Sequence, residues 1–323
     1  MLDGDPTFGS SPADGAGVGL RPDASGTRLA IHQRRRRAAA LAALAAFALA
    51  VGMVVGAASG GGSAGVGKAP IVRGYLSRVK TLAGNGPGSF AHAELGAENA
   101  AITRTLRYTP YVRVAGAQHR EIALTFDDGP GPYTERVLAT LEQLHTPATF
   151  FQVGISQKYF GAATANIVAR GYPIGDHTWS HQPMSELTPR QQQAQLLQET
   201  SAIGDYGAPF PRMFRPPYGL WDKATLKLLR RYRMLMILWT VDTNDYQLPG
   251  VAAIVRSAVG GAKPGAIILM HDAGGTRTET IDALPEIVHA LRRRGYTLVT
   301  VPRLLLDNPA PGQQDVGALG AGG

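Results

Sequence analysis

The sequence of 323 residues contains no cysteine. A disulfide framework, a zinc–thiolate site and a thiol nucleophile are therefore excluded. Aromatic residues are also few, at 7% of the chain, whereas there are 40 glycines and 22 prolines, many of them near the two ends. Aromatic and β-branched residues concentrate between Glu121 and Leu306, so one folded domain with a substantial apolar core is expected there.

The twenty residues Ala38–Ala57 carry no charge and directly follow the four arginines Arg34–Arg37. Twenty residues in a helix span about 30 Å, the thickness of a bilayer core. The arginines favour a cytoplasmic amino end, so everything after the segment is expected outside the membrane. The small residues at 56–58 resemble a signal cleavage site. Residues 38–58 are therefore predicted to be a transmembrane anchor or a signal peptide, giving a membrane-anchored or secreted protein. A buried soluble helix is disfavoured, because the segment has no polar stripe.

Basic residues outnumber acidic ones, 32 to 24, and the formal net charge is +8. Six of the basic residues lie within the first 37 positions, beside the predicted membrane segment, so no nucleic-acid partner is expected. The rest of the positive charge suits an anionic cell-wall surface.

Low-complexity sequence sets the remaining boundaries. Residues 1–37 lack hydrophobic periodicity and are predicted to be a disordered cytoplasmic segment. Residues 59–118 begin as a Gly/Ser/Ala tether and continue without a clear pattern, which favours a linker or stalk. Residues 307–323 are rich in Pro and Gly and are predicted to be a disordered tail. The catalytic domain is expected at 119–306.

Within that domain, short apolar runs alternate with segments of helical periodicity. Seven strands are predicted, at 122–126, 148–153, 172–176, 213–216, 235–241, 266–271 and 297–301. Helices are predicted at 134–144, 189–203, 223–231, 251–262 and 281–294. This alternation indicates an α/β fold with a parallel sheet covered by helices, either open or closed into a barrel.

Two adjacent carboxylates, Asp127 and Asp128, follow the first predicted strand and precede Gly129-Pro130. Neighbouring residues of an extended chain point in opposite directions, so one carboxylate can bind a cation while the other faces a substrate. In the alternative interpretation, an aspartate only caps the next helix.

Two histidines, His177 and His181, are spaced to lie on one side of a helical turn. Together with one carboxylate they would form a two-histidine, one-aspartate set, which suits Zn²⁺ and leaves positions for water and substrate. A surface turn without metal is the alternative. The HEXXH pattern of metalloproteases is absent.

Three further polar positions end predicted strands. They are Arg215 before two prolines and Tyr218, the run from Asp242 to Asp245 and Tyr246, and the run from Leu269 to His271 and Asp272. Each alone is typical of a structural role. Because α/β folds place their sites at the carboxyl ends of strands, all five groups together indicate one active site.

These five motifs, in this order, resemble the polysaccharide deacetylases with a NodB-homology domain, carbohydrate esterase family 4. The resemblance covers about residues 119–306 and implies a distorted (β/α) barrel with fewer than eight strands. One departure concerns the acetyl pocket, because Tyr246 stands where many members have tryptophan.

The resemblance also implies a role for each matching residue. The metal ligands would be Asp128, His177 and His181, holding Zn²⁺ or another divalent metal such as Co²⁺. The catalytic residues would be the general base Asp127, the general acid His271, Asp245 to orient that acid, Arg215 to keep the base ionised, and the backbone N–H of Tyr218 to stabilise an oxyanion. The substrate-binding residues would be Leu269, Trp239 and Tyr218, with core packing an equal interpretation of Leu269 and Trp239.

The function expected on this basis is metal-dependent hydrolysis of N-acetyl groups on the sugars of an extracellular polysaccharide. The predicted location favours peptidoglycan, while chitin oligomers, acetylxylan or a non-sugar amide are alternative substrates. An inactive glycan-binding module is the alternative of another class, and the intact set of polar residues argues against it.

Overall fold

The computed structural model describes residues 88–316. The predicted segments 1–37 and 38–58 lie outside the described residues, as does the first part of the predicted linker. Among residues 88–316, no helix combines the length and the apolar character needed to cross a bilayer.

Nine strands form one sheet, and all pairs between named strands are parallel. The order is β1-β6-β5-β4-β3-β2-β8-β7, with β9 also paired to β2. The strands are β1 (Tyr111–Val112), β2 (Glu121–Asp127), β3 (Thr149–Gln152), β4 (Ile174–Asp176), β5 (Met213–Phe214), β6 (Leu235–Ile237), β7 (Val241–Asp242), β8 (Ile267–His271) and β9 (Thr297–Val299).

The sheet curls because β6 and β7, which are close in sequence, lie at or near its two opposite ends. Strand β6 pairs with β1 and β5, and only three residues later β7 pairs with β8. Between them, the N–H of Leu238 donates to the carbonyl of Val112, and the N–H of Thr240 donates to the carbonyl of Ile267. The sheet is therefore a distorted (β/α) barrel, as the resemblance implied. It has nine short strands rather than the seven predicted, because the predicted single strand at 235–241 is two strands and β1 was not predicted.

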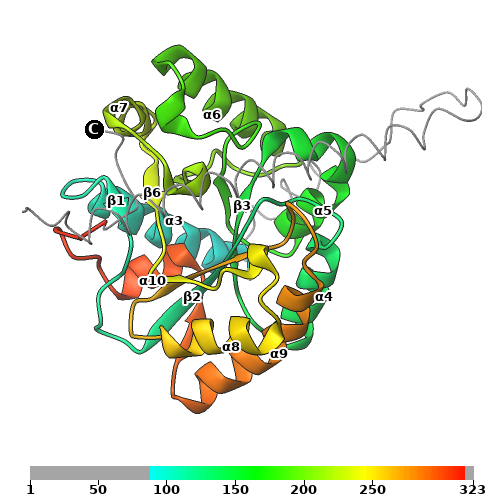
Figure 1. Cartoon of the computed structure of the whole chain (residues 1–323). Helices are drawn as coiled ribbons and strands as arrows, with labels where there is room; N and C mark the ends of the chain where they lie inside the picture. Colours follow the sequence, from blue (N-terminus) through cyan, green and yellow to red (C-terminus); the bar gives the residue numbers. More distant parts are fainter. Residues whose placement is uncertain (1–87, 317–323) are drawn as a thin grey trace, which may run out of the picture. The chain divides into compact units, whose positions relative to one another are not determined.

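Helices surround this sheet (Figure 1). The long ones are α3 (Gly88–Thr105), α4 (Thr134–Gln143), α5 (Gln157–Ala169), α6 (Pro189–Gly204), α7 (Lys223–Tyr232), α8 (Val251–Gly260), α9 (Thr278–Arg293) and α10 (Val301–Asp307). Short 3₁₀ turns are η1 (Gly154–Ser156), η2 (Met184–Glu186), η3 (Pro217–Gly219) and η4 (Asp245–Gln247). The sequence predicted five of these helices but not α3, α5 or α10.

In strand β2, side chains that point alternately to the two faces place apolar residues in the core and a carboxylate at the site. Ile122, Leu124 and Phe126 lie in the apolar cluster that also contains residues of α4, α8 and α9. On the opposite face, Ala123 belongs to a second cluster, and Asp127 follows at the carboxyl end of that same face. The strand thus buries one face under helices and directs its last carboxylate into the barrel.

Helix α3 packs against α10 in that second cluster, which contains Ile102, Leu304 and Leu305. The two helices lie side by side in Figure 1. The predicted linker is therefore wrong for residues 88–118, and the domain begins before residue 119. The sequence of α3 did not reveal this, because its buried positions include the small residue Ala101 and the polar residues Glu98 and Thr105 beside Ile102.

The predicted disordered tail is also wrong over residues 307–316. Ala310 is buried, and Oε1 of Gln314 accepts hydrogen bonds from the backbone N–H groups of Arg113 and Val114. This segment covers the chain around β1, so its Pro and Gly residues shape a packed turn rather than a free end.

Candidate active site

Polar side chains from several strand ends meet at one edge of the barrel. Asp127 and His271 are directly opposite each other in the register of β2 and β8. The N–H of Arg215, which follows β5, donates to the carbonyl of Asp176, the last residue of β4. The parallel register therefore gathers the five predicted motifs at the carboxyl ends of the strands, as expected for this fold class.

Three predicted metal ligands converge. Oδ1 of Asp128 lies 3.1 Å from Nε2 of His181 and 3.6 Å from Nε2 of His177. The two Nε2 atoms are 3.2 Å apart. One donor atom from each residue lies within 4.8 Å of the others, so the trio can surround a single ion.

The trio stands on strained backbone. Asp128 (φ 74°), Thr178 (φ 73°) and His181 (φ 56°) all adopt the left-handed conformation that residues with a Cβ rarely take. Hydrogen bonds hold the histidine turn: the N–H of Thr178 donates to Oδ1 of Asp176, and the N–H of His181 donates to Oγ1 of Thr178. Thr178 thus fixes the spacing of the two imidazoles.

The hydrogen bonds of the imidazoles suit a metal. Nδ1 of His177 lies 2.7 Å from the carbonyl oxygen of Arg215. A carbonyl only accepts, so Nδ1 carries the proton and Nε2 presents a lone pair to the trio. Nδ1 of His181 lies 3.1 Å from the hydroxyl of Tyr218. Buried Oδ1 of Asp128 accepts no hydrogen bond from any residue in 88–316. An unsatisfied carboxylate oxygen beside two oriented imidazoles fits a divalent metal.

Electrostatics keep the trio's carboxylate charged. Burial raises the pKa of Asp128, but the nearby charge of His181 and the contact of His177 outweigh burial and hold this pKa well below its usual range. For His177, burial lowers the pKa, but the charges of Asp127 and Asp128 raise it above the ordinary value. The negative charges of Asp127 and Asp128 therefore favour a cation at this position.

Asp127 forms a buried ion pair with Arg215. Nη1 of Arg215 donates to Oδ1 of Asp127 over 2.7 Å and to Oγ1 of Thr125 over 2.8 Å. Arg215 is completely buried, and its guanidinium lies over the ring of Phe151, 4.1 Å from the centroid. Oδ2 of Asp127 lies 3.7 Å from Nε2 of His177. One oxygen is thus held by arginine while the other borders the trio.

His271 and Asp245 form the second buried pair. Nδ1 of His271 lies 2.7 Å from Oδ1 of Asp245, whose Oδ2 accepts hydrogen bonds from the N–H of His271 and from Oγ1 of Thr280. Burial lowers the pKa of His271, but the carboxylate of Asp245 raises it more, to about 9. The imidazole is therefore protonated at neutral pH and can donate a proton.

Tyr218 contributes to the site in two ways. Its residue is left-handed, with φ 59°, and its hydroxyl contacts His181. Burial, and then the charge of Asp128, raise the pKa of this hydroxyl, so it stays protonated at neutral pH. Within residues 88–316, the backbone N–H of Tyr218 has no carbonyl acceptor, which leaves it available for an oxyanion.

The predicted acetyl-binding residues Leu269 and Trp239 are both buried. Leu269 shares the face of β8 that carries His271, because the two are two residues apart. Trp239 follows β6, and its ring lies 5.8 Å from the guanidinium carbon of Arg215. Both side chains are buried in one apolar cluster. Tyr246 lies edge-on to His271, with ring centroids 5.4 Å apart.

Two buried acids behind the histidine turn were not predicted. Asp176 accepts hydrogen bonds from Thr178 and Thr200, and Glu199 on α6 has no hydrogen-bond partner for either carboxylate oxygen among the described residues. Burial raises the pKa of both groups. The adjacency of Asp176 to His177 was a signal available in the sequence, whereas no local pattern marked Glu199.

A third buried acid is Asp272, which was named from the sequence at the end of a strand without a predicted role. Its Oδ2 accepts a hydrogen bond from Oγ1 of Thr134 over 2.5 Å, and its N–H donates to the carbonyl of Asp127. A Cβ at Gly129 would lie only 2.4 Å from Oδ2 of Asp272, so only glycine fits at this position. Burial, and then the charges of Asp128 and Asp127, raise the pKa of Asp272 to about 7.

Comparison with known proteins agrees with this geometry. The family model for polysaccharide deacetylase matches residues 115–237. A peptidoglycan-N-acetylglucosamine deacetylase from Bacillus cereus is 36% identical over 187 residues, covering 57% of this chain and 87% of the relative. A chitooligosaccharide deacetylase from Bradyrhizobium sp. is 34% identical over 199 residues, covering 57% of this chain and 90% of the relative.

A solved structure of a peptidoglycan N-acetylglucosamine deacetylase, in complex with 4-naphthalen-1-yl-N-oxidanyl-benzamide, has the same fold. Its TM-score is 0.60 at 28% identity, and the match covers 64% of this chain and 97% of that one. The sequence relatives, the fold and the residues gathered at the strand ends agree with one another. The chain therefore belongs to the polysaccharide deacetylase family and is an enzyme of that family.

Proposed function

We propose that this enzyme is a zinc-dependent, extracytoplasmic N-deacetylase acting on the acetylated amino sugars of peptidoglycan. The observation that carries the proposal is the convergence of the trio Asp128, His177 and His181 beside Asp127, whose register partner on the neighbouring strand is His271. Such a site combines a cation position with a carboxylate and a protonated imidazole, groups that metal-assisted amide hydrolysis can use.

The trio Asp128, His177 and His181 would hold the zinc. When bound, zinc polarises an acyl oxygen and lowers the pKa of a water towards about 7. The protein's own residues prepare this position through the His177–Arg215 and His181–Tyr218 contacts, which orient both imidazoles before any ligand arrives.

Asp127 serves as the general base. Its Oδ1 is held by Arg215, and its Oδ2 borders the trio at 3.7 Å from Nε2 of His177, so this oxygen can accept a proton from a water that attacks the acetyl carbon. The arginine gives this buried carboxylate an oppositely charged partner and fixes its orientation. The N–H of Tyr218 donates to the oxyanion that the attack creates, a contribution of about 3–4 kcal/mol per donor in other hydrolases.

His271 serves as the general acid. An amine is a poor leaving group unless it is protonated, and His271 carries a proton at neutral pH because Asp245 stabilises its charge. The hydrogen bond to Asp245 also fixes the tautomer, since Nδ1 points to the carboxylate and Nε2 is left for the substrate. Asp127 and His271 stand opposite each other in the sheet, so the two proton transfers occur on neighbouring strands.

Leu269 and Trp239 are the proposed walls of the acetyl pocket, since both lie near the two proton-transfer residues and present apolar atoms. Peptidoglycan is the proposed polymer for two reasons. Relatives with this activity match the domain at up to 36% identity, and the amino-terminal sequence predicts export. Chitin oligomers are the second candidate, because relatives named chitooligosaccharide deacetylases match at 34% identity.

The test is acetate release by the full-length chain from peptidoglycan, chitin oligomers and acetylxylan, with Asp127→Asn as the inactive control. We expect zinc-dependent release from peptidoglycan, with the deacetylated sugar identified by mass spectrometry. Faster release from chitin oligomers or acetylxylan would replace the polymer assignment. If zinc-loaded protein bound glycan but released no acetate from any of them, it would be a binding module.

A further inference from the structure

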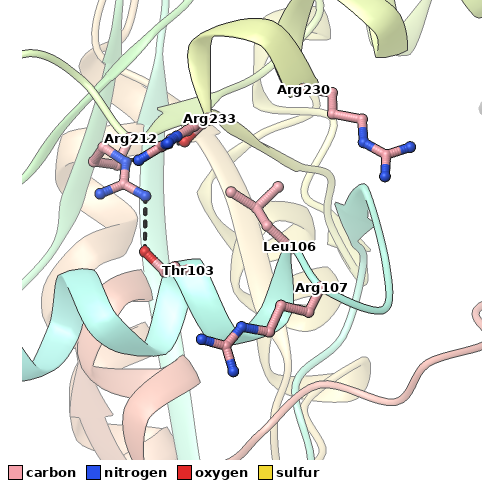
Figure 2. Close-up of a pocket in the computed structure, with 6 residues that line it drawn as sticks. All are labelled: Thr103, Leu106, Arg107, Arg212, Arg230 and Arg233. Atoms are coloured by element: carbon pink, nitrogen blue, oxygen red, sulfur yellow. Dashed lines mark hydrogen bonds between the residues drawn. The ribbon is translucent and has the colours of Figure 1, made fainter.

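A second polar pocket lies away from the active site, between α3, the start of β5 and the end of α7. It has a volume of about 210 Å³ and is lined by Thr103, Leu106 and four arginines, Arg107, Arg212, Arg230 and Arg233 (Figure 2). Arg212 immediately precedes β5, whereas the active site is built after the strands end. The pocket therefore opens at the opposite end of the barrel.

Four positively charged side chains gather in this pocket. None of its four arginines forms an ion pair with a carboxylate of the described residues. Arg212 donates instead to the hydroxyl of Thr103 and to the carbonyl of Arg233. Burial, and then the charge of Arg233, lower the pKa of Arg212, so like charges face each other here. An anion would relieve this repulsion.

Neighbouring residues extend the charge beyond the pocket. Helix α7 carries Lys223, Lys227, Arg230 and Arg231 and no acidic residue, and Arg104 adds to the basic end of α3. Arg107, Arg230 and Arg233 are exposed, so a ligand can reach them from solvent. Together these exposed basic residues of α7 and α3 form a surface around the pocket, the basic strip.

We propose that this arginine pocket binds a phosphate group of a linear anionic polymer. Guanidinium groups bind phosphate through paired N–H donors, and the lining supplies arginines from three separate parts of the chain. The volume is below the roughly 300–1,000 Å³ typical of pockets that enclose a whole drug-sized ligand, so it suits one group of a longer chain. The basic strip would contact the neighbouring phosphates.

The lining favours a phosphate polymer without bases or acyl chains. Leu106 is the single apolar residue of the lining, and it is half-buried, so there is no apolar surface for a lipid tail. No aromatic residue lines the pocket, and single-stranded nucleic acids bind largely by stacking on aromatic rings. Binding here would hold a deacetylase against a phosphate-bearing polymer while the opposite end of the barrel acts on glycan.

The test compares binding of the full-length chain to polyphosphate and to polyglutamate of equal charge, at constant ionic strength. The variant is Arg107→Gln with Arg230→Gln, which removes two exposed charges from two elements. The matched control is Arg256→Gln with Arg293→Gln, two exposed arginines on α8 and α9. We expect the pocket variant to weaken polyphosphate binding at least tenfold and the control variant less than twofold.

Polyglutamate should bind more weakly than polyphosphate and equally to all three proteins. Equal losses in both double variants, equal losses for both polymers, or no polyphosphate binding by the unaltered chain would each overturn the proposal. If the pocket variant lost binding to vesicles containing phosphatidylglycerol while its polyphosphate binding stayed unchanged, the proposal would also be overturned, in favour of a lipid ligand. Acetate release and thermal unfolding should be unchanged in both variants, so a failure of the proposed enzymatic function is recognised separately.

Discussion

The two sides of the active site are built differently. The trio Asp128, His177 and His181 stands on turns, where two of its three members adopt left-handed backbone. The proton-transfer residues Asp127 and His271 end regular parallel strands, and each is held by one buried, oppositely charged partner. The trio therefore depends on local backbone geometry, whereas the proton-transfer side depends on ion pairs between distant elements.

This difference predicts distinct effects for substitutions on the two sides of the site. Changes in the trio should remove metal binding with little effect on the packed strands. Changes on the proton-transfer side should leave metal binding intact while altering rate, pH dependence or stability. The following predictions test that separation, from the largest effect to the smallest.

Asp128→Ala should reduce kcat/KM by at least about 10³-fold, because it removes a metal ligand and with it several kcal/mol of charge stabilisation. Zinc binding, measured by calorimetry, should be lost in the same variant. Asp282→Ala, an exposed change on α9, is the control and should alter neither quantity. Retained zinc affinity in Asp128→Ala would contradict the assignment of the trio.

Asp127→Asn should lower kcat about 10²–10⁴-fold, the usual contribution of a positioned general base. Zinc affinity should stay within a few-fold of the unaltered enzyme, because Asp127 is not part of the trio. Steady-state kinetics and zinc titration on the same preparation give both values. Loss of zinc together with activity would mean that the two sides are not separable.

Arg215→Met should destabilise the fold by about 3–5 kcal/mol, because it leaves the Asp127 carboxylate buried without its partner. Urea unfolding measures this free energy. Arg170→Met removes a partly exposed pair with Glu142 and should change stability by about 0–1 kcal/mol. Equal effects of the two changes would show that the buried pair is not special.

Asp245→Asn should move the alkaline limit of activity to lower pH. His271 has a pKa of about 9 in the metal-free fold against an ordinary 6.5, so its acidic form is present below that value and is lost as pH rises through it. The same pair contributes stability that is complete below about pH 6.5 and disappears as pH rises through about 9. Without the carboxylate, the pKa and the alkaline limit both fall. An unchanged profile of kcat against pH would exclude His271 as the acid.

Tyr218→Phe should have the smallest effect, about a tenfold loss of zinc affinity, because it removes only the hydroxyl that contacts Nδ1 of His181. The backbone N–H of residue 218 is kept, so kcat at saturating zinc should change little. Tyr232→Phe, whose hydroxyl bonds Gln193 away from the site, is the control. A large fall in kcat at saturating zinc would assign the hydroxyl a direct part in the reaction.

Local sequence predicted the strands of the barrel because each carries a short apolar run. It could not predict that the run 235–241 divides, since the change of partner from β1 to β8 near Leu238 is set by the closure of the sheet. Strand β1 was not predicted, because its two residues lie in a stretch of sequence without a clear pattern. Helix α5 was missed because its apolar residues are interrupted by Gly161, whose missing side chain makes room for Tyr206.

The structure brings the predicted site residues together, and their individual roles stay predictions. All eight residues given a metal or catalytic role lie in the gathered motifs, because strand-end polar residues of a parallel sheet meet at one edge. The residues that surround and support them could not be predicted from the sequence. Thr280 and Glu199 lie on helices far along the chain from the residues that they approach, and nothing in their own surroundings marks them. Long-range packing, rather than local pattern, selects such partners.

The most direct test of the account is a zinc titration of metal-free, full-length enzyme, with bound zinc and acetate release followed together. The account predicts that activity is absent without metal, rises in proportion to bound zinc and saturates at one equivalent, and that Asp128→Ala shows neither binding nor activity. Full activity in the metal-free enzyme, or saturation of the trio without any acetate release, would contradict it.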